Sequence, residues 1–175
     1  CYSINMKKIN DLNFFKKDAV TLAKNLIGKW IETNINGKVT RAQIKETEAY
    51  LGIEDSACHS YKGKRTKRTE TMFKEGGTIY IYLCYGMHYL FNIVCAEKDV
   101  PEAVLIRALI EADGPAKATK YLNIDESLNG EMIIKNSKIS VLNDGKTYSY
   151  VSAKRVGIDY ALEKDKNALL RFVLN

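Results

Sequence analysis

The chain has 175 residues, of which 46% are hydrophobic and 27% are charged, a composition typical of one soluble globular domain. No apolar run approaches the roughly 20 residues that a membrane-spanning helix needs, so we expect no membrane partner. The net charge of +6 favours a polyanionic partner, although mildly basic proteins are common.

The N-terminus and the cysteines indicate a cytoplasmic protein. The segment CYSINMKKINDLNFFKK lacks the apolar region of a secretory signal. We expect Met6 to be the natural start and residues 1–5 to be left over from cloning. The four cysteines form no C-x-x-C pair and no disulfide framework, which fits a reducing cytosol.

The first predicted elements are marked by the residues that begin and end them. DAVTLAKNLIGK (18–29) predicts a helix with Asp18 as its N-cap and Gly28 as its stop. KWIETNINGKVTRAQIKETEAY (29–50) predicts a β-hairpin, because the step Asn36-Gly37 suits a type I′ turn.

The segment TIYIYLCYGMHYLFNIV (78–94) predicts two strands separated by a break at Tyr85-Gly86. Strand alternation places three aliphatic side chains on a core face, namely Ile79, Ile81 and Leu83. The opposite face then holds Tyr80, Tyr82 and Cys84. For Tyr80 we expect an ordinary packed ring.

The rest of the chain predicts further strands and one more helix. AVLIRALI (103–110) is typical of a buried strand, and Pro115 suits the first turn of a helix in DGPAKATKYL. VSAKRVGI and ALLRFVL predict two closing strands. We therefore predict a single α+β domain over residues 1–175, with a curved, mostly antiparallel β-sheet, flanking helices and a protruding β-hairpin.

Positive charge is concentrated in the segment KGKRTKR (62–68), where five of the seven residues are basic. Such a segment is either a solvated loop or a loop that grips phosphates. The charge pattern alone does not decide between the two.

Two carboxylates follow each other in KETEAY. Alternation places Ile44, Glu46 and Glu48 on one strand face, which suggests a partly buried carboxylate able to act as a general base. The competing interpretation places both glutamates on an exposed edge, paired with neighbouring lysines. The pattern does not choose between Glu46 and Glu48.

Two polar residues interrupt apolar strands and need partners. Arg107 lies within AVLIRALI, and a buried arginine needs an anionic partner such as Glu46 or Glu48. Asn92 in LFNIV likewise needs a reason to lie in an apolar strand. Together with the basic loop and the tyrosines, these features suggest chemistry on a nucleic acid base.

We expect no metal and no organic cofactor. Cysteine and histidine ligands are present, but their spacing matches no zinc pattern (Cys58, His59, Cys84, His88 and Cys95). The sequence also contains no glycine-rich phosphate loop, no G-x-S-x-G elbow and no H-E-x-x-H motif.

Three ordered blocks of the sequence resemble the alkyladenine (3-methyladenine) DNA glycosylases of base-excision repair. They are ETEAYLGIEDSACHSYKGKRT, MFKEGGTIYIYLCYGMHYLFNIV and AVLIRAL. The likeness covers nearly the whole chain. It implies a monomeric, monofunctional enzyme that excises alkylated purines, with deaminated purines as an open further class, from double-stranded DNA. In a bacterium it would associate with the nucleoid.

The resemblance also implies roles for individual residues. Glu48 would activate the hydrolytic water, and Arg107 would hold that water or Glu48 itself. The flipped base would lie in a pocket formed by Tyr50, His59, Tyr82 and Asn92, with Tyr50 and Tyr82 on its two faces. The excision of a base requires flipping because the bond cannot be reached inside the stack.

On the DNA side, the resemblance implies that Tyr85 enters the minor groove and fills the gap that the flipped nucleotide leaves. The further implied DNA contacts are Lys64, Arg65, Lys67, Arg68 and Met87. Three other functions stay open: a non-catalytic nucleic-acid-binding module, a metal-dependent hydrolase, and a lyase that acts through a lysine Schiff base.

The chain departs from the family pattern at three places. The family usually has Thr-Pro-Arg-Asn where this chain has Thr66-Lys67-Arg68-Thr69, which puts individual DNA contacts in doubt. Ile53 stands where proline is usual. The connection from Ile110 to Gly114 is shorter than in relatives, and we expect it either to be naturally short or to lack a segment.

Overall fold

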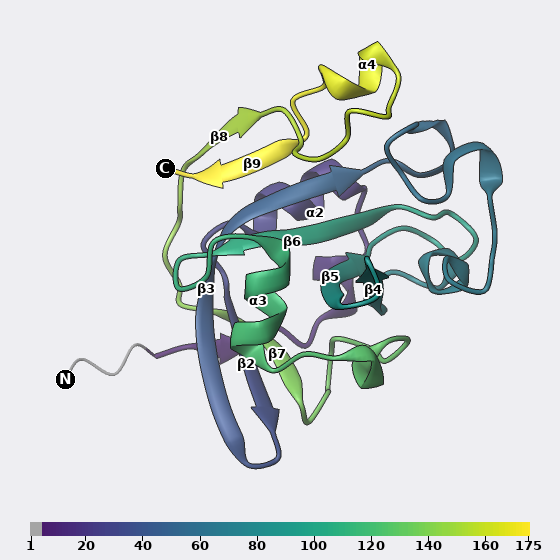
Figure 1. Cartoon of the computed structure of the whole chain (residues 1–175). Helices are drawn as coiled ribbons and strands as arrows, with labels where there is room; N and C mark the ends of the chain where they lie inside the picture. The colour runs from purple at the N-terminus through teal and green to yellow at the C-terminus, as the bar shows by residue number, and fades with distance from the viewer. Residues whose placement is uncertain (1–4) are drawn as a thin grey trace.

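A long bent strand, β3 (Lys38–Tyr50), organises the sheet. Its first half pairs with β2 (Trp30–Ile35), and its second half pairs with β6 (Ala103–Leu109) on one side and β9 (Arg171–Leu174) on the other. The computed structural model describes residues 5–175, so the expectation about residues 1–5 lies outside the described residues except at Asn5. Figure 1 shows the sheet curling around α2.

The described residues form a nine-stranded sheet with the order β1-β7-β2-β3-β6-β5-β4, to which β9 and β8 are added beside β3. Every pairing in it is antiparallel. The predicted α+β fold with a curved antiparallel sheet is therefore confirmed. The remaining strands are β1 (Lys7–Lys8), β4 (Ile79–Cys84), β5 (His88–Val94), β7 (Ile139–Asn143) and β8 (Tyr150–Ala153).

The first predicted helix and hairpin are confirmed. In α2 (Ala19–Leu26), the Asp18 carboxylate accepts a hydrogen bond from the Thr21 backbone N–H, as an N-cap should. Asn36 and Gly37 both have positive φ, 53° and 80°, which is the geometry of a type I′ turn.

Helices cover one face of the sheet. α2 and α3 (Pro115–Leu122) pack on the main hydrophobic core with the inward side chains of the strands. A smaller cluster lies on the other face and contains Cys58, Met72, Phe73, Tyr80, Val94 and Ala103. The remaining helices are short: α1 (Leu12–Phe15), α4 (Glu163–Lys166) and 3₁₀ turns at Gly52–Glu54, Tyr61–Gly63, Glu70–Phe73 and Glu126–Leu128.

A β-bulge in β3 changes which side chains share a face. The register against β6 shifts on both sides of Glu46. Ile44 lies in the main core, and Thr47 lies on that same face, where its hydroxyl donates to the Ala23 carbonyl at 2.8 Å. The prediction that Ile44 shares a face with Glu46 and Glu48 is therefore wrong, because the extra residue reverses the alternation.

Both glutamates are nevertheless buried, and β3 is an inner strand there, with β6 on one side and β9 on the other. The interpretation that placed them on an exposed edge is therefore wrong as well.

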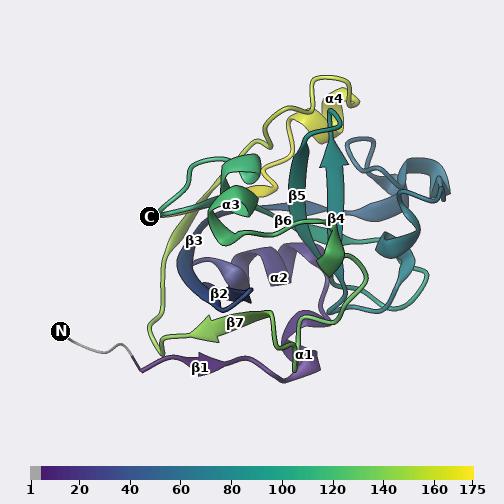
Figure 2. The same ribbon diagram turned by 60° about the horizontal axis from the view of Figure 1, so that its bottom comes forward.

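β4 and β5 form the second hairpin, which Figure 2 shows side by side. At its tip Tyr85 and Gly86 have φ of 52° and 68°, and the Met87 N–H donates to the Cys84 carbonyl at 3.2 Å. The prediction of a core position for Leu83 is wrong, since its side chain is 39% exposed. The hairpin has left the core by that point.

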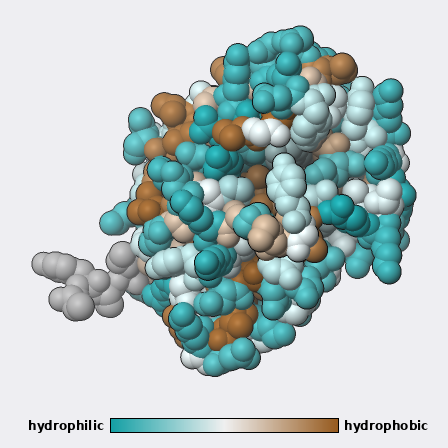
Figure 3. Space-filling model, viewed as in Figure 1, coloured by the Kyte–Doolittle hydropathy of each residue, from teal (hydrophilic) through white to brown (hydrophobic). Residues whose placement is uncertain are grey.

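The C-terminal part is less regular than predicted. VSAKRVGI forms a strand only in its first half, β8, while residues 154–158 are irregular. β7 and the short β1 were not predicted. No helix in residues 5–175 is both long and apolar enough to cross a membrane. On the face seen in Figure 3, hydrophilic side chains predominate and hydrophobic ones form separate patches.

Candidate active site

Glu48 is held in one orientation by groups from two distant parts of the chain. Its side chain is 1% exposed. The Tyr50 hydroxyl donates to Oε1 at 2.8 Å, and the Val156 backbone N–H donates to Oε2 at 2.8 Å. Arg107 Nε lies 3.9 Å from Oε2. Two hydrogen bonds and an ion pair thus compensate the buried charge.

Burial raises the pKa of Glu48, because a carboxylate loses its hydration inside the protein. The hydrogen bonds from Val156 and Tyr50, and the charges of Arg107 and Arg155, oppose this rise. A carboxylate with a raised pKa is a better proton acceptor than an exposed one.

Glu46 has a different environment, although it belongs to the same motif. Its Oε2 lies 3.3 Å from Nη1 of Arg171 and 3.9 Å from Nη1 of Arg107. Arg107 therefore bridges Glu46 and Glu48, which confirms the predicted pairing of this arginine. Because Glu46 is engaged by two arginines and Glu48 by Tyr50, the structure separates two residues that the sequence pattern left equivalent.

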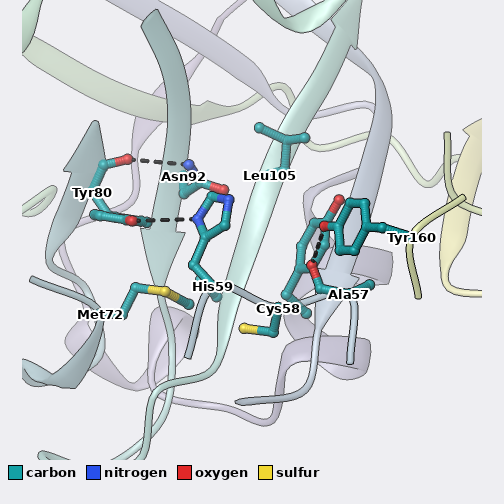
Figure 4. A pocket seen from close by; sticks show the side chains of 10 residues that line it. Ala57, Cys58, His59, Met72, Tyr80, Asn92, Leu105 and Tyr160 are labelled. Atoms are coloured by element: carbon teal, nitrogen blue, oxygen red, sulfur yellow. Dashed lines mark hydrogen bonds between the residues drawn. The ribbon is translucent and has the colours of Figure 1, made fainter. Parts of the chain in front are cut away.

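A cavity of about 60 Å³ lies beside these residues, next to the Tyr50 ring. Figure 4 shows its walls, with His59 between the Tyr80–Asn92 side and the Tyr160 side. Its lining combines three tyrosines and a histidine with small and sulfur-containing side chains: Tyr50, Ala57, Cys58, His59, Met72, Tyr80, Asn92, Ala103, Leu105 and Tyr160. Such a lining suits a flat, partly apolar ligand.

His59 presents its ring to this cavity, and Tyr82 lies behind it. The two rings are stacked, with centroids 3.9 Å apart and planes 27° apart. Tyr82 does not line the cavity. Across from Tyr50, the ring that lines this cavity is therefore that of His59, and Tyr82 lines the neighbouring cavity.

Burial, together with the charges of Arg68 and Lys64, lowers the pKa of His59, so its imidazole is neutral at pH 7. Its Nδ1 lies 3.5 Å from the Tyr80 hydroxyl, at the long limit of a hydrogen bond. Tyr80 is 2% exposed and lines the cavity, so it is both a packed ring, as predicted, and part of the cavity wall.

Asn92 uses its side-chain amide to hold the strand backbone. Its Nδ2 donates to the Tyr80 and Leu90 carbonyls, both at 3.3 Å. These contacts give a structural reason for an asparagine in an apolar strand, and they leave its Oδ1 as the atom available to a ligand in the cavity.

The basic loop borders a second, larger cavity of about 550 Å³, which shares Cys58 and His59 with the first. Lys64, Lys67 and Arg68 line it. Arg65 does not, because its guanidinium pairs with Glu70 at 2.7 Å and Asp99 at 3.1 Å. Of the four basic residues expected to contact DNA, three thus remain available to an anion.

Arg68 joins the basic loop to the second hairpin. Its guanidinium lies 4.5 Å from the centre of the Tyr82 ring and donates to the Leu83 carbonyl. Beyond that point the hairpin tip is exposed, with Tyr85 at 90% and Met87 at 70%. Tyr85 and Met87 thus place two apolar side chains in solvent at the same hairpin tip.

Three contributors to the site were not predicted from the sequence. They are the Val156 N–H, the Tyr160 ring, and a buried ion pair between Arg155 and Asp55. Arg155 follows Lys154 in a less apolar segment than Arg107, so it carried no comparable signal. The Val156 N–H carried none either, since a backbone donor leaves no trace in the sequence.

Within residues 5–175, no group of three or more His, Cys, Asp and Glu side chains is arranged to hold a metal ion. Cys58, Cys84 and Cys95 are free thiols.

Comparison with known proteins identifies the family. The family described as "Methylpurine-DNA glycosylase (MPG)" matches residues 13–112 and 110–175. Similar proteins come from Borrelia garinii subsp. bavariensis (46% identical over 94% of this chain and 95% of its own), Natranaerobius thermophilus (42%; 94% and 94%) and Clostridium perfringens (40%; 93% and 93%). Each carries the name "Putative 3-methyladenine DNA glycosylase". The chain belongs to the methylpurine-DNA glycosylase family, which confirms the resemblance seen in its sequence.

The family match is split where the sequence has its short connection. Its two parts meet at residues 110–112. There the chain makes a tight turn, closed by hydrogen bonds between the backbones of Leu109 and Ala112, and Glu111 accepts a hydrogen bond from the Gln43 N–H at 3.1 Å. The turn lies on β6 at the end opposite to the cavity residue Ala103.

Proposed function

We propose that this protein is a monofunctional DNA glycosylase that flips an alkylated purine out of double-stranded DNA and hydrolyses the bond between base and sugar, leaving an abasic site. The observation that carries the proposal is the pairing of Glu48 with Tyr50. One residue is a buried carboxylate of raised pKa, the other forms a wall of the cavity, and a 2.8 Å hydrogen bond joins them.

The surface around the cavity supports an approach to duplex DNA. Flipping a nucleotide costs a few kcal/mol of unstacking, and a side chain inserted in the vacated space opposes its return. Tyr85 is the exposed ring at the tip of the β4–β5 hairpin, so we assign this insertion to it. The cations of Lys64, Lys67 and Arg68 would hold the sugar-phosphate backbone beside the cavity.

Cleavage places positive charge on the sugar as the base departs, so water attack there benefits from a positioned carboxylate. Glu48 would accept the proton of this water. Arg107, 3.9 Å from both Glu46 and Glu48, would keep the Glu48 carboxylate in place. In this role Arg107 positions Glu48 and does not contact the substrate.

Substrate choice would follow from the lining of the cavity. An alkylated purine is often cationic, which weakens its bond to the sugar, and aromatic rings favour a stacked cation. Deaminated purines are neutral and would depend more on positioning. We include them as a second substrate class.

The test compares Glu48→Gln with Glu46→Gln in single-turnover assays on a duplex that contains 7-methylguanine. Loss of a general base slows a reaction by about 10²- to 10⁴-fold, so we expect excision by Glu48→Gln to fall in that range while binding of the duplex persists. Glu46→Gln removes a carboxylate of the same motif but leaves both hydrogen bonds to Glu48 in place, so its excision should fall by less than that of Glu48→Gln.

Each alternative function gives a different result in the same assay. Normal excision by Glu48→Gln would remove Glu48 from its assigned role. Binding without any base release by the wild type would indicate a non-catalytic nucleic-acid-binding module. Activity abolished by a chelator would indicate a metal-dependent hydrolase, and a complex trapped by borohydride would indicate a lyase.

A further inference from the structure

A fully buried ion pair lies next to the site and connects residues that are far apart in the sequence. The Arg155 guanidinium donates to both oxygens of the Asp55 carboxylate, at 2.6 and 2.9 Å. The side chains are 0% and 3% exposed. Arg155 Nη1 also donates to the Ala49 carbonyl at 3.0 Å, so the guanidinium is attached to the strand that carries Glu48 and Tyr50.

This ion pair contacts the site at two points. Arg155 Cζ lies 4.9 Å from the centre of the Tyr50 ring. Tyr50 lines the cavity and Arg155 does not, so the Tyr50 ring, and not the guanidinium, forms the cavity wall. Val156, the next residue, donates its N–H to Glu48.

Asp55 fixes the other end of the same wall. Its Oδ2 accepts from the Leu51 N–H at 2.9 Å, and its Oδ1 accepts from the Ala57 N–H at 3.1 Å. The Asp55 carboxylate thus neutralises part of the Arg155 charge, but the guanidinium is the group that lies over the Tyr50 ring.

The Arg155 charge next to the Tyr50 ring acts differently on the two kinds of base. When the bond between base and sugar breaks, its electron pair stays with the base. Water supplies the hydroxyl group to the sugar, and its proton passes to Glu48. A neutral base therefore becomes negative until it takes a proton from solvent, whereas a cationic base becomes neutral. A nearby cation stabilises the negative charge that develops on a neutral base as it departs. The same cation disfavours the binding of a cationic base.

We propose that Arg155 is a specificity-determining residue that acts through Tyr50 and favours the release of neutral bases relative to cationic ones. The proposal rests on the proposed function. For a cationic base, weaker binding and easier departure offset each other, so kcat/KM changes little. For a neutral base only the departure is affected, so kcat/KM rises. The charge therefore alters the ratio of the two kcat/KM values.

The experiment is a competition in which limiting enzyme meets a mixture of two duplexes, one with hypoxanthine and one with 7-methylguanine. Arg155→Met removes the charge at similar volume, while Arg155→Lys keeps the charge. Both lose the two-pronged contact with Asp55. We expect the ratio of hypoxanthine to 7-methylguanine excision to fall by roughly 5- to 30-fold in Arg155→Met and by less than about threefold in Arg155→Lys.

An unchanged ratio in Arg155→Met, or an equal fall in both variants, would overturn the proposal, because the second result is what a purely structural role predicts. If Arg155→Met does not fold, the double variant Asp55→Asn/Arg155→Met removes both buried charges, and Asp55→Asn is its charge-retaining control. A wild type that releases 7-methylguanine but no hypoxanthine contradicts this inference alone. One that releases neither contradicts the proposed function.

Discussion

Tyr50 connects the wall of the cavity to the carboxylate beside it. Its ring lines the cavity, and its hydroxyl donates to Glu48. Burial and the charge of Glu48 raise the pKa of Tyr50 well above its usual value, so the hydroxyl stays a donor at any pH at which the enzyme would work. Tyr50 would thus contact the flipped nucleobase and also influence the pKa of Glu48, the proposed general base.

The pH dependence of Tyr50→Phe tests this connection. The Tyr50 hydrogen bond lowers the pKa of Glu48, so its loss raises that pKa further while the ring remains. A general base must be unprotonated, so activity is lost as the pH falls through its pKa. We expect the acidic limb of the single-turnover pH profile to move to higher pH in Tyr50→Phe.

Tyr80→Phe is the matched control, because the hydroxyl that it removes lies near His59 and not near Glu48. Its acidic limb should coincide with that of the wild type. Coincident limbs for Tyr50→Phe and the wild type would show that Glu48 does not determine the profile.

The β4–β5 hairpin combines a rigid base with an exposed tip. Its first residues, Ile79 and Ile81, are buried in the core, whereas Leu83 and Tyr85 are progressively more exposed. The positive φ of Tyr85 is disfavoured for a residue with a large side chain. An exposed ring in such a backbone conformation contributes little to folding, which is consistent with a role in binding.

Tyr85→Asn removes the ring but keeps the conformation of the turn, because asparagine tolerates positive φ well. We expect a free energy of unfolding within about 0.5 kcal/mol of the wild type, as for other exposed positions. Excision at low enzyme concentration should fall by more than about tenfold, because a flipped base is no longer retained. Thermal unfolding and single-turnover assays check the two parts.

Tyr121→Ala removes another exposed tyrosine, on α3, and should leave excision unchanged. Equal excision by Tyr85→Asn and the wild type would rule out the assigned insertion.

Local signals predicted the elements whose ends are fixed locally. Asp18 caps α2 and Asn36-Gly37 turns the first hairpin through contacts within a few residues. The bulge at Glu46 has no such signal, since the register shift depends on the pairing with β6. The Arg155–Asp55 pair joins residues 100 positions apart, so no local pattern could reveal it. The sequence therefore predicted the strand that carries Glu46 and Glu48, but it did not decide which of the two glutamates is the general base.

Positive side chains lie on both faces of the sheet, so the net charge alone does not show which surface binds DNA. Lys64 and Lys67 line the basic cavity beside the site. Lys117 and Lys120 are also exposed, but they lie on α3, which packs on the opposite face of the sheet. Only the first pair adjoins the hairpin and the base cavity, so position should decide which charges bind DNA.

Two double variants of equal net charge test this assignment. Each phosphate contact contributes about −0.9 to the slope of the logarithm of the DNA-binding constant against the logarithm of the salt concentration, because the contact releases a cation bound to the DNA. For Lys64→Ala/Lys67→Ala we expect binding to lesion-free duplex to weaken and the slope to flatten by roughly 1 to 2. Lys117→Ala/Lys120→Ala should keep the slope of the wild type, since its lost charges lie away from the duplex. Equal flattening in both variants would mean that net charge, and not the basic loop, governs DNA binding.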